Sequence, residues 1–280
     1  MVDGKTLHGG LSDRVRGIIF GYLASKDAGV DFKVHFSSPF KLESYLEPNT
    51  HDWIINESDI SYNSNEAEPI YIHSAFDKQY ESKLKFDYLK KRIAESSKSQ
   101  VHLYSNIIYT KDGRYSSAFK ELFKPTAIVQ KELDRLHSIL GDSYLTATFR
   151  FQNSLGDFAE LNLQPLSPDK QQDLISRCRQ ELEKLHHSYA DKSILVTSDS
   201  KKFLEAVDSL DYVYTIKGEL VHMSFTADSS LDLHKKPFVD YMMIAGAEQI
   251  FLFCTSGMYQ SGFPYTASLI NNRPFKEIRF

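Results

Sequence analysis

Several features that would assign a protein to a class at once are scarce or absent in this sequence. Only two cysteines occur among the 280 residues, Cys178 and Cys254, and they form neither a disulfide framework nor a metal-ligand pattern. No apolar run is long enough to span a bilayer, and residues 1–10 lack the apolar core of a secretory signal. We therefore expect a protein without a transmembrane anchor in the reducing cytoplasm.

The sequence also has no strong excess of either charge and lacks several common catalytic motifs. Its formal net charge is −4, so no basic excess indicates a nucleic-acid partner. The G-x-G-x-x-G fingerprint of dinucleotide-binding proteins and the G-x-S-x-G turn of hydrolases do not occur. No D-x-D pair is present to hold a metal–nucleotide complex, and we predict a site that uses neither a metal nor a cofactor.

What the sequence does contain is an alternation of short apolar segments with helical ones, which predicts the α/β class. The C-terminal half alternates most regularly, as a doubly wound sheet does. A boundary near residues 135–142 divides the chain into expected domains 1–138 and 139–280. Strands are predicted at 31–36, 69–73, 100–104, 144–151, 194–197, 212–216, 249–254 and 275–280, and helices at 11–28, 80–93, 116–123, 126–140, 168–189, 200–209, 237–245 and 261–271.

A glycine pair precedes the first predicted helix, in the sequence GGLSDR at residues 9–14. Gly9 and Gly10 allow the backbone to approach a ligand closely, and a helix N-terminus favours an anion. The alternative is a tight turn in which Ser12 or Asp13 serves as the helix N-cap. The motif is consistent with both interpretations.

An arginine lies at the C-terminal end of the predicted strand 144–151, in the sequence TFRFQN at residues 148–153. Open α/β sheets bind ligands at the carboxyl ends of their strands, and the guanidinium fork of Arg150 suits phosphate oxygens. The alternative is a structural ion pair with a nearby acid. Asp157 and Glu160 lie close by in the sequence, as such a partner or as a general base.

Two further strand ends carry small polar residues. Ser198 and Asp199 follow the strand 194–197, where the acid is able to cap a helix or to bind a ribose or base. Thr255 and Ser256 follow the strand 249–254, and hydroxyl and N–H groups at a helix start form a phosphate cradle. Together with Arg150, these strand ends predict a pocket for a nucleoside diphosphate.

The order of these motifs resembles that of the fucosyltransferase-like superfamily of glycosyltransferases, which includes α1,6-fucosyltransferases, nodulation fucosyltransferases and protein O-fucosyltransferases. The glycine-rich turn before a helix is matched by residues 9–14, and the arginine-bearing strand end by residues 148–151. The strand ending in S-D is matched by residues 196–199. The helix with an internal acid is matched around Asp240, and the hydroxyl-bearing strand end by residues 255–256.

This resemblance implies a GT-B-like fold of two Rossmann-type halves with a cleft between them, and inverting transfer without metal. Arg150 would bind the β-phosphate, Asp199 would lie by the nucleoside, and Asp13 or Asp157 would be the base. Expected partners are a nucleotide-sugar donor and an oligosaccharide or glycoprotein-glycan acceptor. The length and missing anchor are similar to those of small transferases of large algal viruses. The candidate donor-binding residues are Gly9, Gly10, Arg150, Ser198, Asp199, His222, Asp240, Thr255 and Ser256.

Three features depart from the superfamily pattern and affect the expected donor. Thr148 stands where relatives have histidine, Phe151 where they have a second arginine, and residues 152–153 where an acid often follows. These groups help relatives to hold GDP-fucose, so a UDP-linked sugar such as UDP-xylose is an alternative donor. The main alternative function is a catalytically silent nucleotide- or glycan-binding protein on the same fold. A phosphotransfer enzyme is disfavoured because no nucleophile–base pair is evident.

Overall fold

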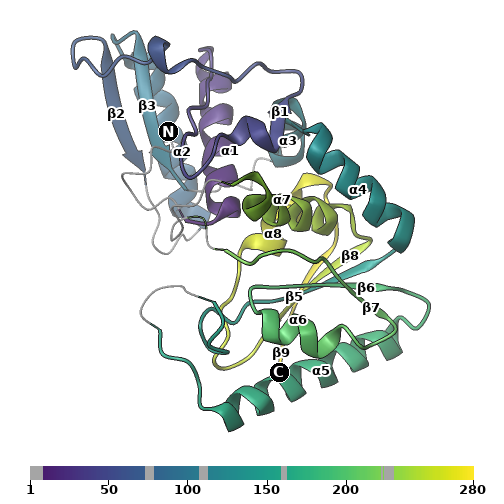
Figure 1. The fold of residues 1–280 in the computed structure, drawn as a ribbon. Coiled ribbons are helices and arrows are strands. Elements are labelled where there is room, and N and C mark those ends of the chain that lie inside the picture. Colours follow the sequence, from purple (N-terminus) through teal and green to yellow (C-terminus); the bar gives the residue numbers. More distant parts are fainter. Residues whose placement is uncertain (1–8, 73–78, 107–112, 159–162, 222, 224–229) are drawn as a thin grey trace. The chain divides into compact units, whose positions relative to one another are not determined.

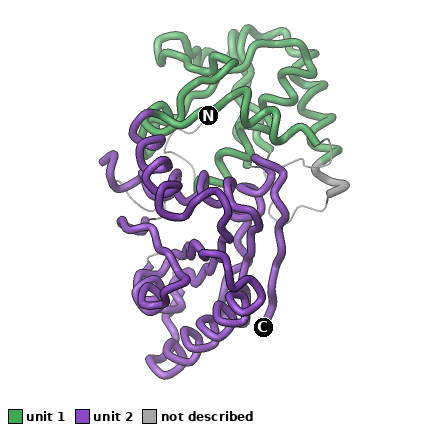
Figure 2. The backbone as a smooth tube through the Cα atoms, turned by 90° about the vertical axis from the view of Figure 1, so that its right-hand side faces the viewer, with its two compact units in different colours: residues 1–126 green, residues 127–280 purple. Residues whose placement is uncertain are grey.

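The computed structural model describes residues 9–72, 79–106, 113–158, 163–221, 223 and 230–280. The chain divides into two compact units, residues 1–126 and 127–280 (Figure 2). Each is described by itself below. Among the described residues, none of the helices has both the length and the apolar character needed to cross a membrane.

The first unit is built around helix α1, which packs on a pair of parallel strands. Residues Gly17 and Gly21 of α1 face β3, and a Cβ added at Gly17 would lie 1.9 Å from the carbonyl oxygen of Ser105. This close approach explains why glycine occurs in the middle of a helix, where it otherwise costs stability. The elements of the unit are α1 (Leu11–Ala28), β1 (Leu46–Pro48), β2 (Ala67–Ile72), α2 (Gln79–Glu95), β3 (Gln100–Ser105), α3 (Tyr115–Leu122) and β4 (Phe123–Pro125), with short 3₁₀ turns at Leu42–Ser44 and Glu57–Asp59.

One prediction for the first unit is wrong, and one pair of strands was not predicted. The expected strand 31–36 forms only an isolated parallel bridge between Val34 and Ile54. The segment is buried by the packing of its side chains and does not pair with another strand along its length. Phe36, for example, stacks on Phe40 at 5.4 Å. The antiparallel pair β1–β4 was not predicted, since three-residue strands carry no periodic signal.

The second unit contains a five-stranded, fully parallel sheet in the order β7-β6-β5-β8-β9. Its central strands are buried on both faces, as apolar runs in a parallel sheet should be. The α/β class and the doubly wound arrangement predicted from the sequence are therefore confirmed. The strands are β5 (Leu145–Phe149), β6 (Ile194–Ser198), β7 (Val213–Thr215), β8 (Gln249–Cys254) and β9 (Phe275–Arg279).

Helices cover both faces of this sheet (Figure 1). α5 and α6 pack on one face, in a core where Phe149 of β5 stacks on Phe253 of β8 at 4.9 Å. α7 and α8 pack together on the other. The helix predicted at 237–245 begins six residues earlier, with Pro237 inside it rather than at its first position. The helices are α4 (Ala127–Leu140), α5 (Pro168–Ser188), α6 (Lys201–Val207), α7 (Leu231–Gly246) and α8 (Phe263–Ile270).

Candidate functional site

The topology of the second unit defines where a ligand is expected. The chain runs from β5 outward to β6 and β7, then returns to the other side of β5 to form β8 and β9. The switch point of the sheet therefore lies between the carboxyl ends of β5 and β8. Open α/β sheets bind their ligands at such a point.

Arg150 leaves β5 at this switch point. Its side chain is 18% exposed, and its Nη1 lies 2.9 Å from Oδ2 of Asp199. The guanidinium carbon lies 4.8 Å from the ring centre of Phe158. Aromatic stacking and a carboxylate together fix the plane of the fork, which leaves little rotamer entropy to lose on binding. The ion pair that the sequence offered as an alternative is present, and it is made with Asp199.

Asp199 is the most heavily engaged acid at these strand ends. Its carboxylate accepts hydrogen bonds from the backbone N–H groups of Phe151 at 2.8 Å and Gln152 at 2.7 Å. Gln152 has a φ of 53°, a left-handed conformation that is uncommon outside glycine. Burial raises the pKa of Asp199 to about 6, although Arg150 and the backbone donors act in the opposite direction. Asp199 thus holds the turn after β5 in the shape that presents Arg150.

Beneath this pair, the neighbouring strands are joined by buried hydroxyl groups. The side chains of Thr148 and Thr197 are hydrogen-bonded at 2.8 Å, between residues that are direct partners in the β5–β6 register. A threonine at position 148 is therefore satisfied within the sheet. The hydroxyl of Ser198 accepts the N–H of Ser200 at 3.1 Å, so its described contact serves the turn into α6.

Asp157 lies at the N-terminus of α6. Its Oδ2 accepts hydrogen bonds from the Ser200 hydroxyl and the Lys202 N–H, both at 2.8 Å. The Ser200 hydroxyl in turn accepts from Phe203 N–H and is the N-cap. These are the contacts of a helix cap, favoured by the partial positive charge at a helix N-terminus. The other oxygen, Oδ1, is buried and has no hydrogen-bond partner within the described ranges.

The loop after β8 is tied both to the C-terminal residue and to the Arg150 turn. Arg177 of α5 donates to the Thr255 hydroxyl at 2.9 Å and to the Phe280 carbonyl at 3.2 Å. Tyr259 N–H donates to the carbonyl of Arg150 at 2.9 Å, so the loops that follow β5 and β8 meet at the switch point. Ser256, by contrast, is exposed.

Asp240 lies on α7 and forms a buried ion pair that the sequence did not reveal. Lys236 Nζ lies 2.6 Å from Asp240 Oδ2, and both side chains are almost entirely buried. Burial raises the pKa of Asp240 and Lys236 opposes this shift. The pair has the i, i+4 spacing of one helix face, but Lys236 precedes the helix as predicted from the sequence. If the helix had been predicted to begin at Leu231, the i, i+4 spacing of Lys236 and Asp240 would have indicated this ion pair.

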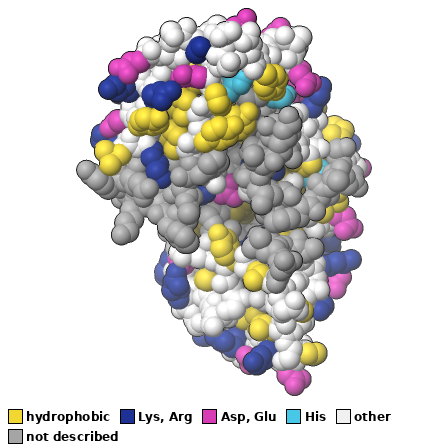
Figure 3. All heavy atoms as spheres, turned by 90° about the vertical axis from the view of Figure 1, so that its left-hand side faces the viewer, with side chains coloured by type: hydrophobic (Ala, Val, Ile, Leu, Met, Phe, Trp, Pro, Cys, Tyr) yellow, Lys and Arg dark blue, Asp and Glu magenta, His cyan; other side chains and the backbone are white. Residues whose placement is uncertain are grey.

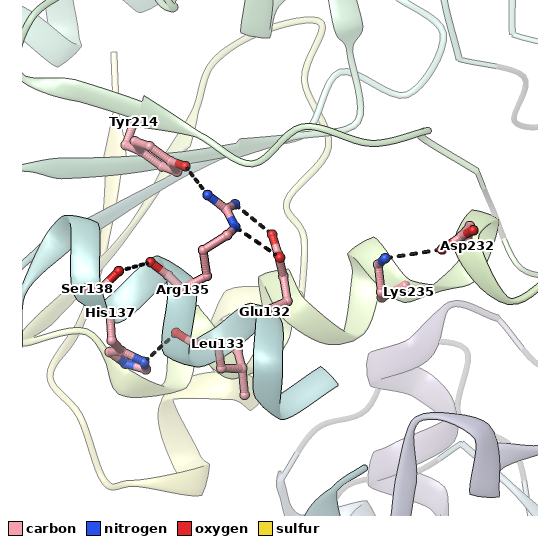
Figure 4. A network of polar contacts seen from close by, with 8 residues as sticks. All are labelled: Glu132, Leu133, Arg135, His137, Ser138, Tyr214, Asp232 and Lys235. Atoms are coloured by element: carbon pink, nitrogen blue, oxygen red, sulfur yellow. Dashed lines mark hydrogen bonds and ion pairs between the residues drawn. The ribbon is translucent and has the colours of Figure 1, made fainter. Parts of the chain in front are cut away.

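A separate polar network joins α4 to β7 (Figure 4). Arg135 makes a two-pronged contact with Glu132, at 3.0 and 2.7 Å, and reaches the Tyr214 hydroxyl at 3.4 Å. Arg135 holds the pKa of Glu132 below its usual value. On α7, Lys235 lies 3.2 Å from Asp232. These exposed pairs fix elements in place, and we assign them no part in the site.

The candidates of the first unit surround the N-terminus of α1. Gly10 is the N-cap, in place of the predicted Ser12 or Asp13. Asp13 accepts the Gly10 N–H at 3.0 Å and pairs with Arg16 at 2.7 Å. Gly9 has a φ of +75°.

Arg14, beside Asp13, holds the backbone before α1 in place, a role that was not predicted from the sequence. It is buried and donates to the carbonyls of Gly9 and Ser38 at 3.0 and 2.6 Å. Burial lowers the pKa of its guanidinium to about 10, against the influence of Asp13. The signal available in the sequence was its place on the apolar side of α1. His222 and Glu160, the remaining candidates, lie outside the described residues.

Comparison with known proteins locates this arrangement among solved folds. No protein-family model matches the sequence, and the search of curated proteins finds no match. Solved structures of fucosyltransferases, however, share the fold over nearly the whole chain. The predicted GT-B-like class is therefore confirmed.

Three of these structures illustrate the similarity. A FUT1 mutant from Arabidopsis thaliana, solved with GDP, is 13% identical with a TM-score of 0.59, over 96% of this chain and 68% of its own. The α-1,6-fucosyltransferase NodZ, soaked with GDP-fucose, is 10% identical with a TM-score of 0.62, over 93% and 89%. POFUT1 in complex with GDP is 12% identical with a TM-score of 0.54, over 96% of both chains.

Proposed function

We propose that this protein is a glycosyltransferase that takes a sugar from a nucleotide-sugar donor held by the second unit. The observation that carries the proposal is the placement of Arg150 at the switch point of a parallel sheet, on a turn held by Asp199. The fold adds support, since the structures that share it include fucosyltransferases solved with GDP or GDP-fucose. A guanidinium carries five N–H donors in a rigid fork, which suits the oxygens of a diphosphate.

The proposed reaction is a single displacement with inversion at the anomeric carbon. The acceptor hydroxyl oxygen forms a bond to that carbon while the bond to the β-phosphate oxygen breaks, and the hydroxyl proton passes to a carboxylate. Arg150 stabilises the negative charge that accumulates on the departing nucleoside diphosphate. We propose that the step requires no metal. The donor is GDP-fucose or a UDP-linked sugar such as UDP-xylose.

The contacts of the two candidate bases differ in what they imply. Asp157 has one oxygen bonded to the start of α6 and the other buried, so its described contacts position α6. The side chain of Asp13 is 31% exposed beside Arg16, so it is the more accessible of the two carboxylates. We therefore retain Asp13 as the proposed base and Asp157 as the second candidate.

The proposal is tested by donor binding and turnover in an Arg150→Ala variant. We expect kcat for transfer or donor hydrolysis to fall about 100- to 1,000-fold, as when a preorganised charge stabiliser is removed. Arg179→Ala removes an exposed arginine of the same unit and is the matched control. The assay offers GDP-fucose and UDP-xylose separately and measures the released nucleotide. Activity of Arg150→Ala equal to that of the control would show that the arginine serves the fold alone.

A silent binding protein is the second candidate, and one observation favours it. Both proposed bases already have partners, Asp157 at α6 and Asp13 at Arg16. Such a protein would bind GDP or UDP in calorimetry yet release no sugar from either donor. Asp13→Asn and Asp157→Asn would then leave the measured affinity for nucleotide unchanged.

A further inference from the structure

A row of aromatic side chains lies on one face of the β2–β3 pair in the first unit. The two strands are parallel, with Tyr71 directly opposite Tyr104 in the register. Their rings stack at 4.7 Å with an interplanar angle of 12°. Two positions earlier on β3, His102 contacts the ring of Tyr62 edge-on at 5.8 Å. We call these four residues, Tyr62, Tyr71, His102 and Tyr104, the aromatic row.

The row occupies the face of the strands opposite to the core of the unit. Side chains alternate between the faces of a strand, and Ile70 and Ile72 are buried on the other face. Leu103 likewise points to α1, where it would meet a Cβ added at Gly21. Tyr71 is consequently 60% exposed and Tyr62 is 65% exposed. Hydrophobic and histidine side chains gather on the upper part of the side of the molecule where β2 and β3 lie (Figures 1 and 3).

The described strand residues on the face that carries the row have no formal charge. The strand residues that share it are Ala67, Pro69 and Tyr71 on β2 and Gln100, His102 and Tyr104 on β3.

The ion pair between β2 and α2 lies on the other face of the strands. Glu68 of β2 projects to that face and contacts Arg92 of α2 at 3.3 Å. Burial lowers the pKa of His102, which favours its neutral form. The described strand residues of this face therefore offer no cation to a phosphate or another anion.

The exposed rings of Tyr62 and Tyr71, with Tyr104 buried against Tyr71, match one class of ligand closely. A pyranose ring with equatorial hydroxyls has an apolar C–H face that stacks on an aromatic ring and a polar rim that bonds to groups around it. Burying such aromatic surface is favourable. Beside the row, the Ser61 N–H donates to Gln100 Oε1 at 2.9 Å, and the Ser61 hydroxyl donates to the carboxylate of Glu66 at 2.6 Å. Contiguous exposed apolar patches, unlike single exposed residues, mark binding surfaces in soluble proteins.

We propose that the aromatic row binds a neutral oligosaccharide, with one sugar ring stacked on the outer face of Tyr71 and the chain continuing toward Tyr62. His102 contacts the ring of Tyr62 and Tyr104 stacks on Tyr71, so these two side chains hold the binding rings in place. The proposal depends on the proposed transferase function only in identifying this oligosaccharide as the acceptor. Binding itself is independent of any nucleotide-sugar.

The test measures binding of cellotetraose and chitotetraose to the full chain by saturation-transfer NMR and calorimetry, without nucleotide. We expect Tyr71→Ala to weaken the binding about tenfold, corresponding to about 1.4 kcal/mol, and Tyr62→Ala to weaken it in the same direction. Tyr71→Phe keeps the ring and should bind within about threefold of wild type, a change of less than 1 kcal/mol. Tyr88→Ala removes a half-exposed tyrosine of α2 and serves as the matched control.

Three outcomes would overturn the assignment. These are no detectable binding of either tetrasaccharide, equal binding by Tyr71→Ala and Tyr88→Ala, or tighter binding of a hyaluronan tetrasaccharide, whose carboxylates find no cation among the described strand residues of this face. A pull-down in which the row captures a protein but no sugar would count against it as well. Nucleotide binding measured on the same samples separates the two proposals. Oligosaccharide binding without nucleotide binding would refute the donor site and leave the aromatic row standing.

Discussion

At the scale of single residues, the carboxylate of Asp199 carries the geometry of the candidate site. It pairs with Arg150 and accepts two backbone N–H bonds from the following turn. Such interactions normally keep an acid ionised, yet burial raises its pKa to about 6. The charge on Asp199, and with it the hold on Arg150, therefore changes within the range between neutral and mildly acidic pH.

This pKa gives a stability prediction whose sign follows from linkage. The folded protein binds the Asp199 proton more tightly than the unfolded chain, where the pKa is about 3.9. The contribution of this carboxyl to stability is fully present below the unfolded pKa and is lost as pH rises through about 6. Wild type should thus lose stability relative to Asp199→Asn between pH 5 and pH 7. Urea unfolding of both proteins at the two pH values measures the difference, and a constant difference would contradict the assigned pKa.

At the scale of elements, the close packing of α1 on β3 rests on the absence of a side chain. Gly17 lies where a Cβ would be 1.9 Å from the Ser105 carbonyl oxygen, a distance that no packing arrangement tolerates. Strand backbone has little room to move because β3 is also paired with β2. The helix and the sheet are therefore held at a distance that only glycine permits.

We predict that Gly17→Ala destabilises the protein despite the higher helix propensity of alanine. Overpacking costs about 1–3 kcal/mol, more than the gain of about 1 kcal/mol from propensity. Gly10→Ala is a suitable control, since no atom lies within 4 Å of its added Cβ. Trp53, the one tryptophan of the sequence, is fully buried in the same unit, so its fluorescence during urea unfolding reports the change. Equal stability of the two variants would show that α1 shifts to accommodate a methyl group.

At the scale of the whole molecule, we propose that the second unit binds the nucleotide-sugar donor. Hydrogen exchange of the full chain with and without GDP or UDP tests this directly. We expect amide protection to rise at residues 150–154 and 256–260, where the loops after β5 and β8 meet. Nucleotide that binds only the native state also stabilises it, by about 2.7 kcal/mol at one hundred times Kd. Protection confined to residues 9–106 would assign the donor to the first unit instead.

The sequence predicted the second unit better than the first, for a physical reason. Its central strands β5, β6 and β8 are buried on both faces, and α4 and α5 have 14 and 21 residues, so each produces a continuous apolar run or a helical period. Helix α1 was predicted over its full extent for the same reason. The segment 31–36 also alternates, yet its burial comes from ring contacts such as Phe36 on Phe40. Alternation reports burial of one face and carries no information about a partner strand.

The sequence by itself determined which polar residues stand at the carboxyl ends of buried strands, because strand ends follow from local patterns. Arg150, Asp199 and Thr255 were identified in this way. Only the tertiary structure decided how they are used, since their partners are distant in the chain. Asp199 contacts a backbone N–H 48 residues away, and Thr255 meets Arg177 across 78 residues. Those contacts depend on the order of strands in the sheet, which no local pattern records.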